Sequence, residues 1–170
     1  HMNDWRAELG LFAMPRFRLP TEAEWEYGSR GKKPMAKYPW GNPYPRNAKG
    51  CVLANFKPGR GNYFDDGFQY TSPVASYFPN SFGLYDMAGN VAEWCEDAWD
   101  DAAVPTVWDL NPIYIDDNEP KKVIRGGSWK DISYFCETGT KDFEYSDTTK
   151  SYIGFRNVVV YLGRSSGSGF

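Results

Sequence analysis

The sequence has almost no histidine. The single one, His1, precedes Met2, a pair typical of a cloning remnant rather than of a natural chain. No native histidine is therefore expected for a Ser-His-Asp triad, a Cys-His pair, a His-ligated zinc or a facial-triad iron site. Cysteine is also scarce. Cys51, Cys95 and Cys136 are an odd number without CxxC spacing, which excludes a zinc ribbon and leaves one disulfide plus one thiol, or three free thiols.

Long apolar runs and an excess of basic charge are missing as well. No run approaches the roughly 20 residues that a membrane-spanning helix needs. No signal peptide is visible, but this says little about location, because a native leader before the first residues would have been removed. The formal net charge of −3 gives no reason to expect a nucleic-acid partner.

Aromatic residues, glycine and proline are abundant. Aromatics make up 18% of 170 residues, with 17 Gly and 12 Pro, which is typical of one folded, loop-rich domain. Thr21 and Glu24 form a capping-box pattern that predicts a helix, with Trp25 facing inward and Gly28 or Gly31 at its end. Residues 1–15 are ambiguous, and within them residues 5–12 are compatible with a short helix.

The rest of the chain reads as loops and short strands. Residues 38–78 are rich in Gly, Pro, Asn and Asp and predict long ordered loops, which need fastening by aromatic burial, a disulfide or metal ions. Residues 83–99 predict a turn running into a β-like segment, and residues 97–120 an acidic surface insertion. The best strands lie in residues 123–129 and 152–162. The predicted class is α+β with an antiparallel sheet, few helices and a large irregular fraction.

Two segments carry oxygen ligands suited to calcium. Asn55 and Asp66 are side-chain donors in the first. In the second, Asp86 and Glu93 bracket a turn that can present the carbonyls of Gly89 and Val91. Calcium takes six to eight oxygens and commonly mixes carboxylates, amides and carbonyls. The alternative is that these residues only form Asx turns and solvated loop edges.

The motifs FRLPTEAEWEY, YPWG, GLYDMAGNVAEW, RGGSW and YIGFR occur in one order over residues 16–162. In this combination the chain resembles the formylglycine-generating enzyme family, also called sulfatase-modifying factors. The resemblance implies a C-type-lectin-like, or FGE-sulfatase, fold in residues 16–164. It makes residues 1–15 an extension or a truncated start of the domain, and residues 165–170 a flexible tail.

The resemblance also implies calcium as a structural cofactor, held by two ligand sets. The sets are Asn55, the Phe56 carbonyl, Asp66 and the Phe68 carbonyl, and then Asp86, the Gly89 and Val91 carbonyls, and Glu93.

Family enzymes oxidise a substrate cysteine with copper(I) held by two thiolates, five residues apart after a Gly-Gly-Ser segment. These positions fall on Asp131 and Cys136 here. Aspartate is a hard oxygen donor and a poor ligand for Cu(I). We therefore expect no copper, no catalytic residues and an inactive homologue in which both positions are vestigial.

Further segments, including residues 48–68 and 143–157, resemble a narrower family, the GldK/PorK lipoproteins of gliding motility and type IX secretion in Bacteroidota. This resemblance implies a non-catalytic structural subunit that self-associates into a ring. It also implies a GldN/PorN-like partner and a location at the periplasmic face of the outer membrane. The membrane would be reached only through a lipid anchor that this chain lacks.

Two other functions stay open. One is a cysteine-modifying enzyme of the formylglycine-generating type that uses Cys136, and the other is a C-type-lectin-like ligand-binding receptor. Each of these side chains also has a purely structural interpretation. In it, Cys136 is a packing residue, Arg125 and Arg156 are internal anchors, the tryptophans belong to the core, and the acidic runs are solvated faces. Cys51 and Cys95 are candidates for pairing with each other in an oxidising compartment.

Overall fold

The computed structural model describes residues 8–10, 17–59, 61–101 and 112–159. Within these ranges the predicted α+β class is confirmed. The elements with defined bounds are β1 (Phe17–Arg18), α2 (Glu22–Arg30), β2 (Ala92–Ala98), β3 (Lys121–Arg125), β4 (Lys141–Tyr145), β5 (Ile153–Gly154) and β6 (Val158–Val159). Most of the ambiguous segment 1–15 and all of the expected tail 165–170 lie outside the described residues.

Helix α2 begins as its sequence predicts. The Thr21 hydroxyl accepts a hydrogen bond from the Glu24 backbone N–H (3.1 Å), and the Glu24 carboxylate accepts one from the Thr21 N–H (2.9 Å). The helix ends before Gly31, which has φ +61°. Gly28 lies inside the helix, so of the two predicted stops only Gly31 is right. Trp25 is 2% exposed and faces the core.

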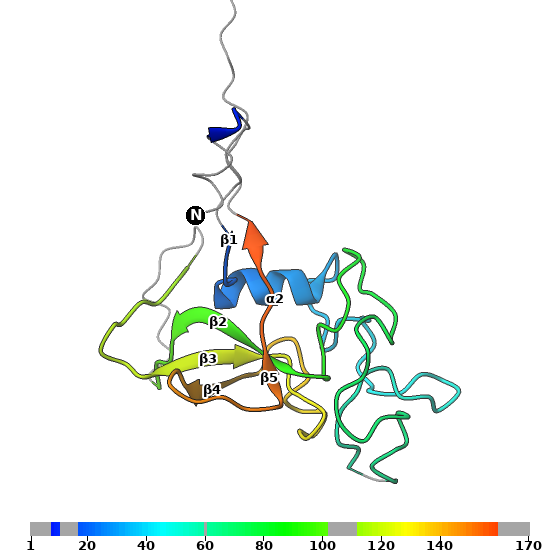
Figure 1. The fold of residues 1–170 in the computed structure, drawn as a ribbon. Coiled ribbons are helices and arrows are strands. Elements are labelled where there is room, and N and C mark those ends of the chain that lie inside the picture. The colour runs from blue at the N-terminus through cyan, green and yellow to red at the C-terminus, as the bar shows by residue number, and fades with distance from the viewer. Residues whose placement is uncertain (1–7, 11–16, 60, 102–111, 160–170) are drawn as a thin grey trace, which may run out of the picture.

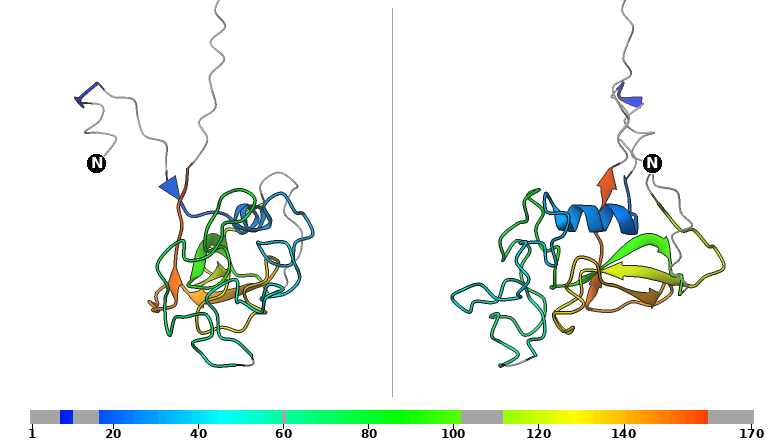
Figure 2. Two further views of the ribbon diagram at one scale, coloured as in Figure 1. Left: turned by 90° about the vertical axis from the view of Figure 1, so that its right-hand side faces the viewer. Right: turned by 180° about the vertical axis from the view of Figure 1, so that it is seen from behind.

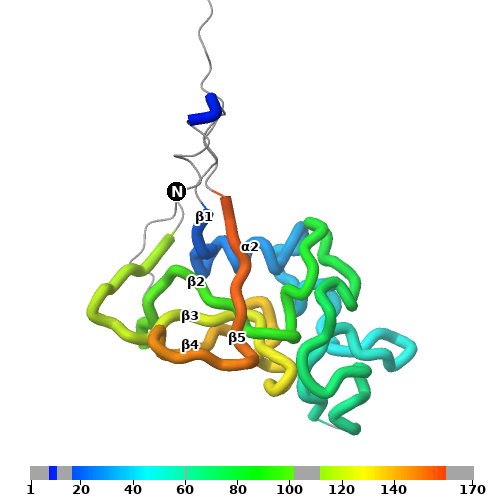
Figure 3. Tube along the Cα trace, in the orientation of Figure 1, coloured from blue at the N-terminus to red at the C-terminus, as the bar shows by residue number. Residues whose placement is uncertain are grey.

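Four strands form a mixed sheet in the order β4-β3-β2-β5. The pairs β4/β3 and β3/β2 are antiparallel, as predicted, whereas β2/β5 is parallel. The prediction of a purely antiparallel sheet is therefore wrong. Helix α2 lies across one face of this sheet (Figure 1), and the left view of Figure 2 looks along the helix and shows the same layering. Strands β1 and β6 pair antiparallel in a separate ribbon, which brings residue 17 next to residue 159 (Figure 3).

The core has two parts. One lies between α2 and the sheet and is built from Trp25, Met87, Cys95 and Val123. The other lies among the loops and is built from Tyr38, Ala54, Phe56, Ala88 and Cys136.

The predicted long loops are present between α2 and β2, where they form the irregular side of the molecule in Figure 1. Side-chain amides tie them down. Asn80 Nδ2 donates to the Gly28 carbonyl (2.6 Å), and Asn90 exchanges hydrogen bonds with the backbone of Ser72. None of the helices in the described part of the chain is long and apolar enough to cross a membrane.

Candidate functional site

Strand β3 ends in a tight turn at Gly126 and Gly127, with φ +89° and +64°. A Cβ on Gly127 would lie 2.9 Å from the carbonyl carbon of Phe135, because the chain folds back over this glycine. The returning loop is anchored where the Trp129 N–H donates to the Asn90 carbonyl (3.0 Å). The turn therefore needs glycine and brings residues 128–136 over the end of the sheet.

Asp131 and Cys136 lie in this loop. Asp131 Oδ2 accepts hydrogen bonds from the Ser128 backbone N–H (3.0 Å) and from Ser128 Oγ (2.6 Å). Cys136 is 1% exposed and belongs to the core among the loops. Burial raises the pKa of the Cys136 thiol, and the charge of Asp131 raises it further. The structure thus brings the two positions together, with the thiol protonated at neutral pH.

This pair does not fit a copper(I) centre built from two thiolates. The oxygen of Asp131 is a hard donor and is already engaged by Ser128, and the Cys136 thiol resists deprotonation. The expectation of no copper stays a prediction, and these contacts support it.

The first predicted calcium set comes together in the loops. Asn55 is 1% exposed; its Nδ2 donates to the Tyr70 carbonyl (2.7 Å), while its Oδ1 is buried without a hydrogen-bond partner. Asp66 Oδ1 accepts from the Phe68 N–H (3.1 Å), and its Oδ2 is also buried without a partner. Burial raises the pKa of Asp66, against hydrogen bonds from the Phe68 and Phe56 backbones that lower it. Two unsatisfied buried oxygens beside both predicted carbonyl residues fit a hard cation.

The second set is arranged differently. Asp86 Oδ2 accepts from the Ala75 N–H (2.8 Å), and its Oδ1 is buried without a partner. The negative charge of Glu93 is already balanced by Arg156, which donates hydrogen bonds to both carboxylate oxygens. Trp25 Nε1 also donates to Oε2 (2.7 Å). Arg156 also donates to the Asp86 carbonyl (3.4 Å). A guanidinium therefore supplies the positive charge at this set, which fits calcium less well than the first.

Gly89 of the second set has φ +72°, and a Cβ there would lie 2.2 Å from the Asn55 carbonyl oxygen. Val91 precedes β2 and is partly buried. The close approach of Gly89 to Asn55 holds the two ligand sets side by side.

The expected internal anchors are confirmed. Arg125 is 1% exposed, pairs with Glu26 and Glu22, and donates to the Thr140 carbonyl (2.8 Å). Arg156 anchors the chain after β5 to Glu93. Trp25 is buried, and Trp40, Trp94 and Trp129 are partly buried.

The interpretation of Asp97 as part of a solvated acidic face is wrong. Asp97 is 4% exposed and accepts hydrogen bonds from the backbone N–H groups of Glu22 (2.6 Å) and Tyr114 (3.0 Å). It caps the start of α2 from 75 residues away. No local pattern reveals such a cap, because its partner is distant in sequence.

All three cysteines are free, Cys51 at the surface and Cys95 in the core, so the candidate pairing of Cys51 with Cys95 is absent. Among the described residues no three His, Cys, Asp or Glu side chains gather as a metal cluster. A calcium site in these ranges would therefore depend on amide and carbonyl oxygens as well as carboxylates.

Comparison with known proteins identifies the family. The sulfatase-modifying factor enzyme 1-like domain (FGE-sulfatase) matches residues 3–160. The chain is 35% identical to the formylglycine-generating enzyme of Thermomonospora curvata, over 89% of the chain and 52% of that protein. It is 37% identical to the mouse enzyme of the same name, over 93% and 43%. It is also 32% identical to inactive C-alpha-formylglycine-generating enzyme 2 of Bos taurus, over 89% and 47%.

A solved structure has a similar fold. PvdO from Pseudomonas aeruginosa superposes with a TM-score of 0.69 at 30% identity, covering 91% of this chain and 56% of PvdO. The chain spans about half the length of the relatives that it matches.

These relatives contradict two expectations from the sequence. Proteins 35–37% identical to the chain are named as enzymes, which contradicts the prediction of an inactive homologue. The same names favour an enzyme of the formylglycine-generating type over a non-catalytic ring component, so that prediction is also wrong. Asp131 changes a single position, whereas the likeness to these enzymes extends along most of the chain. The chain belongs to the sulfatase-modifying factor (FGE-sulfatase) family.

Proposed function

We propose that the chain acts as a formylglycine-generating-type enzyme on a cysteine side chain of a polypeptide substrate. The observation that carries this proposal is the 35–37% identity to enzymes of that name along most of the chain. The overall change is from a thiol to an aldehyde. Water supplies the oxygen, the sulfur leaves as hydrogen sulfide, and two electrons and two protons go to an external acceptor such as dioxygen.

Cys136 is the thiol that this chain offers at the Gly-Gly-Ser turn. Its burial means that a substrate reaches the sulfur only when the loop of residues 128–135 moves aside. The loop is held at its start by the hydrogen bonds from Ser128 to Asp131. Because the pair does not fit a two-thiolate copper site, no step is assigned to copper.

The test is a turnover assay with cysteine-containing peptides and the full 170-residue chain. An aldehyde-reactive hydrazide probe and mass spectrometry detect the product, and a peptide with serine in place of cysteine gives the background. We expect product with the unaltered chain and with Cys51→Ser, and none with Cys136→Ser. Cys51 is the matched control because it is a free thiol at the surface. Absence of product from the unaltered chain with every peptide would contradict the proposal.

We further propose that Asn55 and Asp66, with the Phe56 and Phe68 carbonyls, hold a structural calcium ion. The support is the pair of buried oxygens without partners on Asn55 and Asp66. An ion bound only in the folded state would raise the midpoint of thermal unfolding. We expect a chelator to lower this midpoint and Asp66→Asn to remove the calcium effect. Asp65→Asn is the control, since Asp65 is exposed and pairs with Arg46 (3.0 Å). An equal response to calcium in both variants would refute the site.

The finer assignments from sequence are proposals of the same kind. They are the C-type-lectin-like fold name, the likeness to GldK/PorK lipoproteins, a GldN/PorN-like partner, and a periplasmic location at the outer membrane. A lipoprotein signal in the full-length gene would support the last three. A pull-down with a GldN/PorN-like protein tests the partner directly, and the absence of a complex would count against it.

A further inference from the structure

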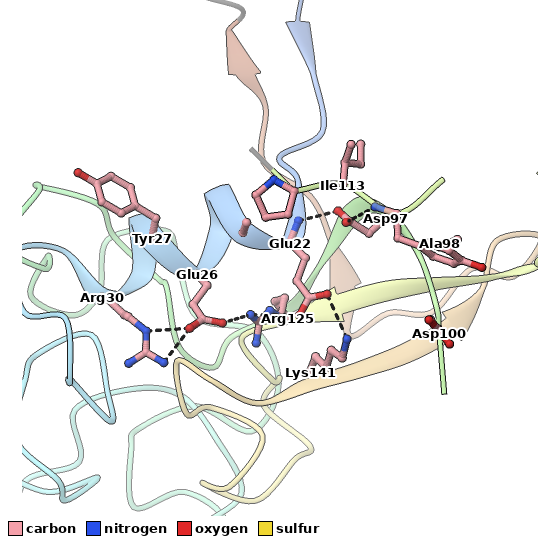
Figure 4. A pocket seen from close by; sticks show the side chains of 13 residues that line it. Glu22, Glu26, Tyr27, Arg30, Asp97, Ala98, Asp100, Ile113, Arg125 and Lys141 are labelled. Atoms are coloured by element: carbon pink, nitrogen blue, oxygen red, sulfur yellow. Dashed lines mark hydrogen bonds and ion pairs between the residues drawn. The ribbon is translucent and has the colours of Figure 1, made fainter. Parts of the chain in front are cut away.

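A cleft of about 480 Å³ opens on the side of the molecule between α2, the strands β2, β3 and β4, and residues 112–114 (Figure 4). This volume lies in the range of small-molecule sites. Cys136 and the predicted calcium ligands do not line it. The cleft is therefore distinct from the candidate site above, and the inference drawn from it does not depend on the proposed function.

The floor of the cleft is a chain of ion pairs. Glu26 pairs with Arg30 (2.7 Å) and with Arg125, and Glu22 pairs with Arg125 (3.4 Å) and Lys141 (3.3 Å). Figure 4 shows Arg125 between the two glutamates. Three cations thus share two carboxylates, and the floor carries an excess of one positive charge.

Arg125 adds a second observation. Its side chain is 1% exposed, yet its Nε–H has no hydrogen-bond partner among the described residues. A buried donor of this kind is costly to leave unmatched. An acceptor oxygen entering the cleft beside Lys141 would meet the excess positive charge of the floor, to which Arg125 contributes. A carboxylate supplies such oxygens.

The rim opposite these cations carries negative charge. Asp97 and Asp100 line the cleft on the side of β2, away from Arg30, and Ile113 lies above Asp97 in Figure 4. Asp97 is held rigidly, because both of its oxygens accept backbone N–H groups. A cationic group near this rim would meet negative charge, and an apolar group would contact Ile113.

We propose that this cleft binds a small zwitterion, a free α-amino acid. Its carboxylate lies toward Arg125 and Lys141, its ammonium group lies toward Asp97 and Asp100, and its side chain lies against Ile113.

The test is titration of the isotope-labelled 170-residue chain with individual amino acids, followed by NMR. We expect saturable shifts at the Ala98 and Ile113 signals for at least one amino acid. Lys141→Met keeps the aliphatic stem but removes the charge and should weaken binding about tenfold or more, since hydrogen bonds to charged groups have effects of this size. Ala23→Phe places a ring on the cleft-facing side of α2 and should abolish the shifts. Met35→Phe is the control, because Met35 is 93% exposed and does not line the cleft.

Analogues of the amino acid that binds separate the two charges. Its amide lacks the carboxylate, and its N-acetyl derivative lacks the ammonium group, so both should bind more weakly than the parent. No saturable shift with any amino acid, equal binding by Ala23→Phe, or undiminished binding of both analogues would overturn the proposal.

Discussion

Substitution of Glu93 tests directly how much its buried ion pair with Arg156 stabilises the fold. Glu93 is 6% exposed. Its carboxylate joins α2, β2 and the chain after β5, because it accepts hydrogen bonds from Trp25 and twice from Arg156. Glu93→Gln keeps the size of the side chain but removes its charge. It also replaces one acceptor oxygen with an amide that faces a guanidinium.

The expected cost follows from these contacts. Removing one partner of a fully buried ion pair costs about 3–5 kcal/mol. The Arg156 side chain is 25% exposed and regains some hydration, so we expect about 2–3 kcal/mol for Glu93→Gln. This is a large part of a typical stability of about 5–15 kcal/mol. It corresponds to a fall in the unfolding midpoint of about 4–12 °C for a domain of this size.

The assay is urea unfolding followed by tryptophan fluorescence, with and without a calcium chelator. Glu137→Gln is the matched control, because Glu137 pairs with Lys37 (3.0 Å), whose side chain is 48% exposed. The control should cost less than about 1 kcal/mol. A Glu93→Gln variant as stable as the control in chelator would refute the reasoning. A cost that appears only with calcium would show that Glu93 binds an ion instead of Arg156.

Three further predictions concern other parts of the chain. Gly89→Ala should prevent folding or lower the free energy of unfolding by more than about 3 kcal/mol, because its Cβ would collide with a backbone carbonyl. Gly83→Ala, also at positive φ but in open space, should lower it by about 1 kcal/mol. Chemical unfolding of the two variants compares these costs. A maleimide should label Cys51 quickly, Cys136 slowly through opening of the loop of residues 128–135, and Cys95 only on unfolding. Mass spectrometry counts the labels, and labelling of Cys95 as fast as Cys51 would contradict its burial. The hydrogen bond from Arg18 lowers the pKa of Glu24 below its usual 4.5, so the contribution of Glu24 to stability is present above pH 4.5 and is lost as the pH falls through the lowered pKa. Glu24→Gln should reduce this loss of stability in acid, as measured by unfolding at a series of pH values. An unchanged loss would contradict the assignment.

The pKa of Asp66 is shifted in the opposite direction from that of Glu24, and this shift makes the calcium effect depend on pH. Burial raises the pKa of Asp66 in the folded chain. In the absence of an ion, the charge of Asp66 therefore opposes folding once the pH exceeds the pKa that Asp66 has in the unfolded state. Calcium should therefore stabilise the chain at neutral pH and lose this effect in acid, as Asp66 takes up a proton. Thermal unfolding at both pH values, with and without calcium, measures the difference. A calcium effect that is unchanged in acid would exclude Asp66 as a ligand.

Local features were predictable because their partners are near in sequence. The capping box of Thr21 and Glu24 spans three residues, and it placed the start of α2 correctly. The spacing from Asp131 to Cys136 is likewise local. The strand predicted over residues 123–129 was wrong in its second half, because β3 ends at Arg125 and Gly126 and Gly127 turn the chain at positive φ. Beyond its own pattern, the sequence carried the family likeness, which the comparisons confirm.

Long-range contacts decided the rest. Asp97 looked like part of an acidic surface, but it caps a helix 75 residues earlier in the chain. Arg156 and Glu93 are 63 residues apart, and their pairing changes what the second calcium set can bind. The charge balance and burial of the cleft arise from α2, β3 and β4 packing together, with Lys141 and Glu22 119 residues apart. A sequence pattern records which side chains are present, whereas burial and the distances between charges, which determine their chemistry, exist only after the chain has packed.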